Sequence, residues 1–353
     1  MSENTITLYP SNWLYNAGVI GLLNIFDALN EDVSKFFDDK YNGAIQLTIS
    51  KSKDEIFSTW VELSPKSNKG RSIVYGYKGA LYANQTEKSI KNRIKNLVTP
   101  SISKSGSKDV YVCGFCNSKF SSNQKDLSVL NQGFGNILSA SEKTFPNMFW
   151  NNEPKYFICK KCEFIITCHH LGLTKLSDNS EIFINAPSFK VMFELNKIVK
   201  EIYGSSNSEE ARSKREILAT SVIEYSRKLQ STIGLWSGMN IEIITKSKQG
   251  IDFFSLPYDT IKIISDRKIA SALSDLGEIR ILNNILDKNY SQLIDISYKL
   301  IRIGLKDYKD RSKNENDIVH DLLFRDINRK NISKAANKIL MLYSLIEEKL
   351  RRS

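Results

Sequence analysis

The chain has 353 residues, of which 41% are hydrophobic and 25% charged, and it contains 17 Gly, 7 Pro and 5 Cys. This length and composition exclude a disulfide-stapled miniprotein and a Gly- or Pro-rich disordered chain. No apolar run approaches the ~18 residues that a membrane span needs. The first residues lack the basic and apolar stretches of a secretion signal, so we expect a cytoplasmic protein with no membrane partner.

Positive charge is concentrated in one segment of this chain, whose net charge is +11. Residues 1–65 carry 4 basic and 9 acidic side chains, whereas residues 66–125 carry 12 basic and 2 acidic ones. Residues 126–259 are balanced, and residues 260–353 carry 19 basic and 13 acidic side chains. A cation that neutralises a phosphate releases a counterion, so segment 66–125 favours a nucleic-acid contact. An ordinary solvated surface is the alternative.

The chain begins with a predicted helix in an α+β domain over residues 1–110. Ser11 or Asn12 can cap this helix, whose apolar residues recur every three or four positions as far as Leu29. Gly18 and Gly21 would let another backbone approach closely.

The rest of this domain is predicted as strands, a basic helix and a linker. Alternation of apolar and polar residues predicts strands at residues 43–50, 57–63 and 73–77, with a loop at 64–70. A Lys-rich helix through Ile90, Ile94 and Leu97 is expected to end at Pro100, before a polar linker at 101–108.

Two Cys-x-x-Cys pairs form the most specific motif, and their members are Cys113, Cys116, Cys159 and Cys162. Four thiolates can close a tetrahedral zinc site with no open position for water, which favours a structural rather than a catalytic Zn²⁺. We therefore predict a zinc-ribbon region over residues 111–186, with residues 117–158 as an insertion. Unliganded thiols or a redox pair at the same spacing are the alternative.

Other potentially reactive residues form no complete constellation. Cys168, His169 and His170 could supply ligands or a nucleophile with its base, but no third member is evident, so we expect them to pack. His320 and Asp321 are similar to the His-Asp pair of metal-dependent phosphohydrolases, which need further His and Asp ligands, and the chain has only 3 His. Because no phosphate loop, dinucleotide fingerprint or hydrolase motif is present, we do not expect an enzyme.

The candidate nucleic-acid-binding residues are cations of the basic segment and amides of a Gly-containing loop in the insertion. They are Lys66, Lys69, Arg71, Lys78, Lys91, Arg93, Lys95, Lys104, Lys108, Lys119, Asn131, Gln132 and Asn136. The amides could bond base edges where two glycines permit close approach, although a simple turn would have the same composition.

The second half of the chain is predicted to be mainly helical. Residues 187–258 read as connecting helices and short strands, with helices at 189–203 and 210–233, a strand at 240–246 and a loop around Pro257. Residues 259–353 are predicted to form an all-α C-terminal helical bundle, with helices near 266–287, 290–306, 315–329 and 331–350.

Taken in order, these features resemble a CRISPR family. The opening helix motif at 13–22, the basic α+β region, the two widely separated Cys-x-x-Cys pairs and the basic helical C-terminus resemble the large subunit of the type I-B interference complex (Cascade), in its Cys-x-x-Cys variety. The resemblance implies a non-catalytic subunit that recognises the protospacer-adjacent motif in double-stranded DNA, aids duplex opening and R-loop formation, and supports recruitment of a separate helicase-nuclease.

The implied partners are crRNA, the target double-stranded DNA, the Cascade backbone subunits, the crRNA-handle-binding subunit and the small subunit. The C-terminal bundle is similar to the small-subunit module that supports the displaced strand, and Met239 could be an internal start for a separate small subunit. Two alternatives stay open: a stand-alone zinc-ribbon nucleic-acid-binding protein, or a metal-dependent nuclease that uses His320 and Asp321 or the stretch 168–170.

Overall fold

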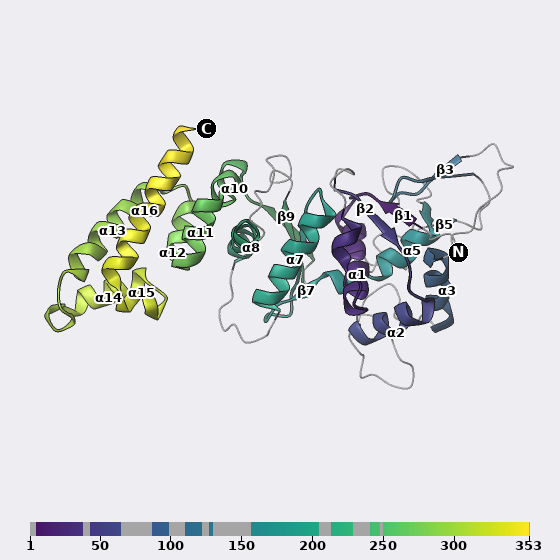
Figure 1. Ribbon diagram of the computed structural model, residues 1–353, viewed down its shortest axis with the longest axis horizontal. Coiled ribbons are helices and arrows are strands. Elements are labelled where there is room, and N and C mark those ends of the chain that lie inside the picture. Colours follow the sequence, from purple (N-terminus) through teal and green to yellow (C-terminus); the bar gives the residue numbers. More distant parts are fainter. Residues whose placement is uncertain are drawn as a thin grey trace. The chain divides into compact units, whose positions relative to one another are not determined.

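The computed structural model describes residues 5–37, 43–64, 87–98, 110–121, 127–129, 157–204, 213–228, 241–247 and 250–352 (Figure 1). The chain forms two compact units. Unit 1 comprises Met1–Ser208 and Ile243–Phe253, and unit 2 comprises Glu209–Glu242 and Phe254–Ser353. Segment 187–258 therefore contributes to both units. Within the described ranges, no helix is long and apolar enough to cross a membrane.

Unit 1 mixes helices with short strands. Its elements are β1 (Thr5–Leu8), α1 (Trp13–Ala28), η1 (Val33–Phe36), β2 (Ile45–Thr48), α2 (Lys53–Leu63), α3 (Glu87–Val98), β3 (Val110–Val112), β4 (Lys119–Ser121), β5 (Leu127–Val129), β6 (Phe157–Cys159), α5 (Lys160–Thr167), α6 (His169–Gly172), β7 (Thr174–Lys175), β8 (Glu181–Asn185), α7 (Phe189–Tyr203), β9 (Glu242–Lys246) and β10 (Ile251–Ser255). Strands β10, β9, β8 and β7 form one sheet in that order, and three antiparallel pairs join β1 to β2, β3 to β4 and β5 to β6.

Helix α1 is the central element of unit 1. The side chain of Asn12 caps it by accepting a hydrogen bond from the backbone N–H of Tyr15 (3.0 Å). Nearly every residue from Leu14 to Phe26 is buried, so the helix is enclosed rather than amphipathic. It packs against α5 and α6, with Gly18 and Gly21 at the contact. The predicted helix and the close approach at its glycines are both confirmed.

The strand predicted at 57–63 is wrong, because these residues belong to helix α2. A capping box begins this helix: the Ser52 hydroxyl accepts from the Glu55 N–H, and the Glu55 carboxylate accepts from the Ser52 N–H. The buried residues Ile56, Phe57 and Trp60 then follow helical spacing. The alternation of apolar and polar residues within 57–63 covers only part of the helix, and over the whole helix the buried residues follow helical spacing. The predicted strand at 73–77 and the linker at 101–108 lie outside the described residues.

Apart from the ends of strands β9 and β10, the described part of unit 2 is helical. Its elements are α8 (Lys214–Lys228), α10 (Tyr258–Ile264), α11 (Arg267–Leu276), α12 (Ile279–Leu286), α13 (Ser291–Gly304), η5 (Tyr308–Asp310), α14 (Lys313–Leu322), α15 (Asp326–Lys330) and α16 (Ile332–Arg351). Helix α13 packs along α16, and α11 packs against α8 and α16. The C-terminal helices are therefore confirmed.

Two of the predicted C-terminal helices are each divided in two. The helix expected over 266–287 ends at Gly277, which has a left-handed φ of 65° and caps α11, and α12 begins after it. The helix expected over 315–329 is α14 followed by α15. It starts earlier than predicted because Ser312 and Glu315 form a capping box.

Candidate metal centre

The four cysteines of the two Cys-x-x-Cys pairs come from different kinds of local structure. Cys113 and Cys116 lie in the turn that joins β3 to β4, where Asn117 adopts a left-handed φ of 55° and its N–H bonds the Cys113 carbonyl (2.9 Å). Cys159 is the last residue of β6, and Cys162 lies in the first turn of α5. The second pair thus sits at a strand-to-helix junction, so the predicted zinc-ribbon architecture is not confirmed.

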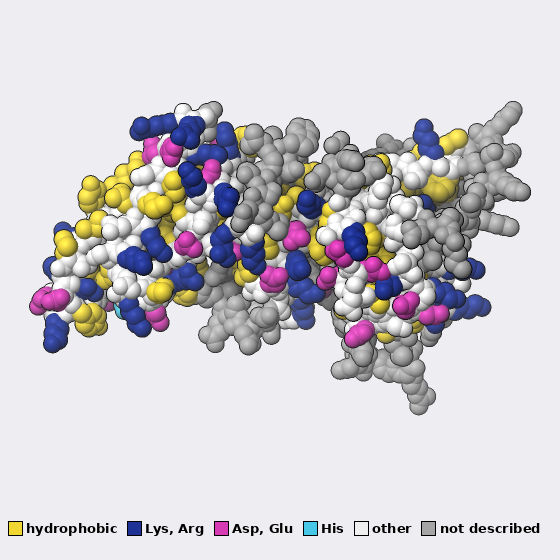
Figure 2. Space-filling view, viewed as in Figure 1, with side chains coloured by type: hydrophobic (Ala, Val, Ile, Leu, Met, Phe, Trp, Pro, Cys, Tyr) yellow, Lys and Arg dark blue, Asp and Glu magenta, His cyan; other side chains and the backbone are white. Residues whose placement is uncertain are grey.

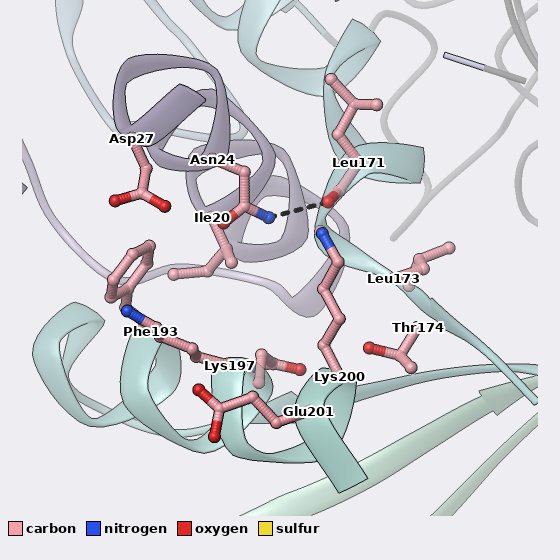
Figure 3. A pocket seen from close by; sticks show the side chains of 12 residues that line it. Ile20, Asn24, Asp27, Leu171, Leu173, Thr174, Phe193, Lys197, Lys200 and Glu201 are labelled. Atoms are coloured by element: carbon pink, nitrogen blue, oxygen red, sulfur yellow. Dashed lines mark hydrogen bonds between the residues drawn. The ribbon is translucent and has the colours of Figure 1, made fainter. Parts of the chain in front are cut away.

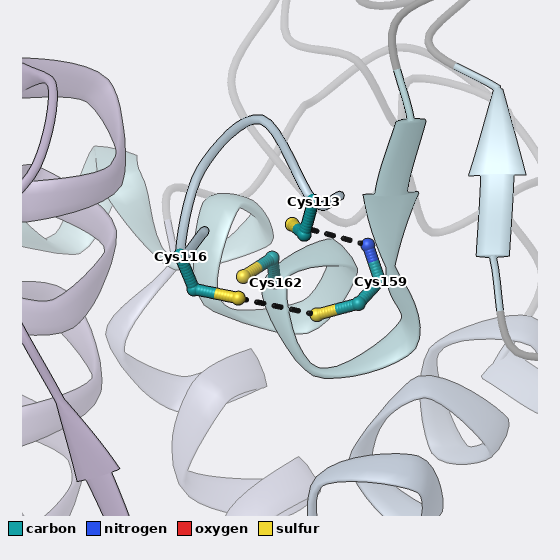
Figure 4. Close-up of side chains that lie close together, drawn as sticks. All are labelled: Cys113, Cys116, Cys159 and Cys162. Carbon is teal, nitrogen blue, oxygen red and sulfur yellow. Dashed lines mark hydrogen bonds between the residues drawn. The ribbon is translucent and has the colours of Figure 1, made fainter. Parts of the chain in front are cut away.

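These residues, here called the four-cysteine cluster, converge on one point (Figure 4). All four Sγ atoms lie within 4.8 Å of one another, and no disulfide links them. The Sγ atoms of Cys116 and Cys159 are 3.8 Å apart. Tetrahedral zinc with Zn–S bonds of about 2.3 Å would separate its sulfurs by about 3.8 Å, so the donor set fits such an ion.

Groups around the cluster suit thiolate ligands. The backbone N–H of Cys159 donates to Cys113 Sγ (3.3 Å), and the Ser118 hydroxyl lies 3.2 Å from Cys116 Sγ. Contact with the other thiols, first with Cys113, holds the pKa of Cys116 well below its usual range, whereas the same contacts and burial raise the pKa of Cys162. A divalent cation would stabilise all four as thiolates.

Helix α1 closes the cluster on one side. Tyr15 is fully buried, and its hydroxyl has no hydrogen-bond partner among the described residues. Burial raises the pKa of Tyr15, and the charges of the four cysteines, Cys162 first, raise it further. The N-terminal helix motif therefore belongs to the surroundings of the four-cysteine cluster, a relation that sequence spacing does not reveal.

The basic helix α3 is attached to the same framework. Its apolar face, formed by Ile90, Ile94 and Leu97, is buried, and α3 packs against α5, which carries Cys162, and against α2. Lys91 forms an ion pair with Asp54 (2.9 Å) and lies over the Phe57 ring (5.0 Å), so part of its charge is already balanced.

Four of the thirteen candidate nucleic-acid-binding residues lie in described segments. Lys91, Arg93 and Lys95 are on α3, and Lys119 is on β4, with Lys95 and Lys119 exposed. The other nine lie outside the described residues: Lys66, Lys69, Arg71, Lys78, Lys104, Lys108, Asn131, Gln132 and Asn136. The described part of the structure therefore brings together the cysteines and a short basic helix.

Cys168, His169 and His170 pack in the interior of unit 1. The Nδ1 of His169 lies 2.9 Å from the Ile166 carbonyl, and the Nε2 of His170 lies 2.8 Å from the Ser64 hydroxyl. Among the described residues, potential metal ligands gather only in the four-cysteine cluster, which does not include these three. His320 and Asp321 lie on α14 in unit 2, where Asp321 pairs with Arg280, and no ligand group forms around them within the described part of the chain.

Burial of these histidines predicts that unit 1 loses stability in acid. Burial lowers the pKa of His169 to about 3 and that of His170 to about 4, from 6.5. Below pH 7 the unfolded chain increasingly takes up protons that the folded chain refuses, so the free energy of unfolding should fall with pH, with a slope that approaches about 1.4 kcal/mol per pH unit for each histidine near pH 5. Denaturant unfolding from pH 7 to pH 5 checks this, and the His169→Gln variant should show a shallower fall. Equal slopes in both proteins would contradict it.

A pocket that the sequence did not indicate lies between α1, the α6–β7 segment and α7, with a volume of about 290 Å³ (Figure 3). Asp27 from α1 and Lys197 and Lys200 from α7 line it, and Asn24 donates to the Leu171 carbonyl (2.8 Å). The pocket therefore offers both hydrogen-bond donors and acceptors. Its residues belong to helix faces far apart in the chain, and no short motif links them.

The fold and the cluster together define a mixed α/β protein with helical C-terminal elements and a candidate four-thiolate metal site. Residues 106–174, which contain all four cysteines, match the family model described as CRISPR-associated protein (Cas_CXXC_CXXC). This match supports a Cas protein with Cys-x-x-Cys motifs. No curated protein and no solved structure matches the chain.

Proposed function

We propose that this chain is the non-catalytic large subunit of a type I-B CRISPR Cascade complex. In this role it recognises the protospacer-adjacent motif in double-stranded DNA, aids duplex opening and R-loop formation, and supports recruitment of a separate helicase-nuclease. The observation that carries the proposal is the four-cysteine cluster, because it lies within the segment that matches a CRISPR-associated family and is assembled in space.

Zinc at this cluster would act as a structural cross-link. Cys113 and Cys116 would hold the β3–β4 turn to Cys159 and Cys162 at the start of α5. Helix α5 in turn packs against α1 and α3, so the ion would fix the basic helix to the core of unit 1. Four thiolates leave no coordination position for water, which supports a role in folding rather than in catalysis.

The basic segment 66–125 would contact nucleic-acid phosphates. It carries 12 basic and 2 acidic side chains, and Lys95 and Lys119 are exposed in its described part. In an RNA-guided complex the guide supplies sequence specificity by base pairing, so the protein needs to read only a few base pairs of duplex. The polar segment 131–136 is the proposed reader of base edges, and the cations supply affinity that depends on salt.

The proposal is tested by isolating the tagged full chain from its native cells and sequencing the RNA that accompanies it. We expect crRNA with a repeat-derived handle, together with several other Cas proteins. A parallel preparation of the Cys113→Ala variant, which should lose the metal site, is expected to recover much less of both. Recovery of the wild-type chain alone, or with unrelated RNA, would contradict the Cascade role and would favour a stand-alone zinc-containing nucleic-acid-binding protein.

A further inference from the structure

Helices α1 and α5 run in the same direction and in register where they touch. The backbone at Gly18 of α1 meets the Ile165 carbonyl of α5, and one turn further along α1 the backbone at Gly21 meets the Cys168 carbonyl at the end of α5. Glycine permits this approach because a Cβ atom at either position would collide with the partner's backbone. A step of three positions along α1 therefore matches a step of three positions along α5.

The same register pairs Tyr15 with Cys162, one turn before these contacts. Tyr15 precedes Gly18 by three positions, as Cys162 precedes Ile165, and residues three positions apart lie on one face of a helix. Cys162 is in the first turn of α5 and belongs to the four-cysteine cluster. Burial raises the pKa of Tyr15 and, after burial, the charge of Cys162 raises it more than that of any other cysteine, as this pairing predicts.

The Tyr15 hydroxyl is a buried hydrogen-bond donor with no acceptor among the described residues. Because burial and the cysteine charges hold the pKa of Tyr15 well above its usual range, the phenol keeps its proton and remains a donor at neutral pH. Leaving such a group unpaired in the interior costs free energy, so an unpaired buried hydroxyl calls for a specific reason. Metal-bound thiolates are the anionic acceptors that its surroundings offer.

The four-cysteine cluster in turn needs hydrogen-bond donors. Four thiolates outweigh one divalent cation, so the loaded cluster keeps a net negative charge in the interior of unit 1. The Cys159 N–H donates to Cys113 Sγ (3.3 Å), and the Ser118 hydroxyl lies 3.2 Å from Cys116 Sγ. Within the described part of the chain, no N–H or hydroxyl group bonds Cys162 Sγ. Cys162 is therefore the thiolate that lacks a donor.

The lysines that lie between Cys159 and Cys162 in the chain are less suited to this role. Lys160 pairs with Glu163 (3.3 Å), and both Lys160 and Lys161 are partly exposed. Figure 2 likewise shows Lys and Arg side chains on the outer surface of the molecule. Water and salt screen such charges, whereas a buried hydroxyl beside the sulfur acts on it at low dielectric.

We propose that Tyr15 is a positioning residue of the metal site, and that its hydroxyl donates a hydrogen bond to the metal-bound thiolate of Cys162. This bond stabilises the negative charge of the sulfur and fixes its position, as the hydrogen-bond partners of metal ligands do in other proteins. The inference rests on the structural metal of the proposed function. It gives the opening helix motif a chemical role, since α1 supplies the donor for a thiolate that α5 carries.

The Tyr15→Phe variant tests this role in the full chain, because it removes the hydroxyl and keeps the ring that fills the core. Tyr203→Phe is the matched control: Tyr203 is also a buried tyrosine of unit 1, but it lies at the end of α7 and not in α1. Zn²⁺ affinity is measured by competition with a chelator of known affinity. We expect Tyr15→Phe to bind Zn²⁺ roughly tenfold more weakly than wild type, since loss of such a partner costs about 10- to 100-fold. Tyr203→Phe should bind Zn²⁺ as wild type does.

Co²⁺ in place of Zn²⁺ reports on the sulfur itself. A hydrogen bond withdraws electron density from a thiolate and raises the energy needed to move charge from sulfur to metal. Its loss in Tyr15→Phe should therefore shift the sulfur-to-cobalt charge-transfer band to longer wavelength, while Tyr203→Phe keeps the wild-type band. Weaker binding with an unmoved band would assign Tyr15 to core packing alone and would overturn the donor role.

The remaining outcomes separate this inference from the proposed function. Equal metal affinity and equal spectra in Tyr15→Phe and wild type would overturn the role of Tyr15 and leave the metal site intact. A wild-type chain that binds neither Zn²⁺ nor Co²⁺ would overturn the metal site, and the role of Tyr15 with it. Because the purified chain is used without crRNA, neither result depends on the Cascade role, which the RNA isolated from native cells tests separately.

Discussion

The Cys113→Ala variant should lose its zinc and much of the stability of unit 1. One zinc ion per chain is expected in the wild-type protein, because four Sγ atoms lie within 4.8 Å of one another. Removal of one thiolate opens the site and leaves Cys116, Cys159 and Cys162 crowded without the cation that would balance them. Structural zinc contributes about 10–16 kcal/mol to the folding of small zinc domains, so we expect metal content near zero and a clearly lower melting temperature.

The Cys168→Ala variant is the matched control for this experiment. Cys168 is also a fully buried cysteine in unit 1, but it does not belong to the four-cysteine cluster. It should keep one zinc and lose only the packing of a small side chain. Metal content is measured by elemental analysis and stability by melting, with and without a chelator. Equal zinc content in the two variants, or a melting curve that a chelator does not change, would contradict a structural metal at the cluster.

The elements that were predicted correctly are long helices, in which the spacing of apolar residues repeats within one stretch of the chain. Helices α1, α7, α13 and α16 each extend over 14 to 20 residues, enough for the apolar spacing to repeat several times. Two-residue alternation predicts a strand at 57–63, but this stretch belongs to helix α2, whose capping residues Ser52 and Glu55 precede it. The apolar spacing continues from α11 into α12, but α11 ends at Gly277 because this glycine adopts the left-handed conformation.

Of the candidate site, the sequence predicts only the four cysteines that could bind the metal. Spacing identified Cys113, Cys116, Cys159 and Cys162, since metal chelation constrains residue type and interval. The sequence does not indicate that Tyr15 is a neighbour of the cluster, because about a hundred residues separate it from the first cysteine. Such contacts depend on tertiary packing, which periodicity does not encode.

Gly21→Ala is expected to destabilise unit 1 although alanine favours helices. A Cβ atom at this position would lie 2.0 Å from the Cys168 carbonyl oxygen and 3.2 Å from the Gly172 backbone nitrogen. Both are backbone atoms of α6 and its cap, so α1 and α6 would have to separate. Overpacking costs about 1–3 kcal/mol and occasionally more, which outweighs the gain of about 1 kcal/mol in helix propensity.

Gly304→Ala in α13 isolates the cause of that loss. Its Cβ would lie 2.5 Å from the Ser333 hydroxyl, a side-chain atom that can rotate away, and 3.1 Å from the Ser333 backbone nitrogen, a contact that a small shift relieves. Helix propensity should offset part of this cost, so the variant should melt closer to wild type than Gly21→Ala does. Gly21→Ala should melt lower and also bind zinc more weakly, because α6 continues from α5, whose first turn holds Cys162. Zinc content and melting are measured together. Unchanged melting and zinc affinity in Gly21→Ala would mean that α1 does not hold the helix that carries the metal site.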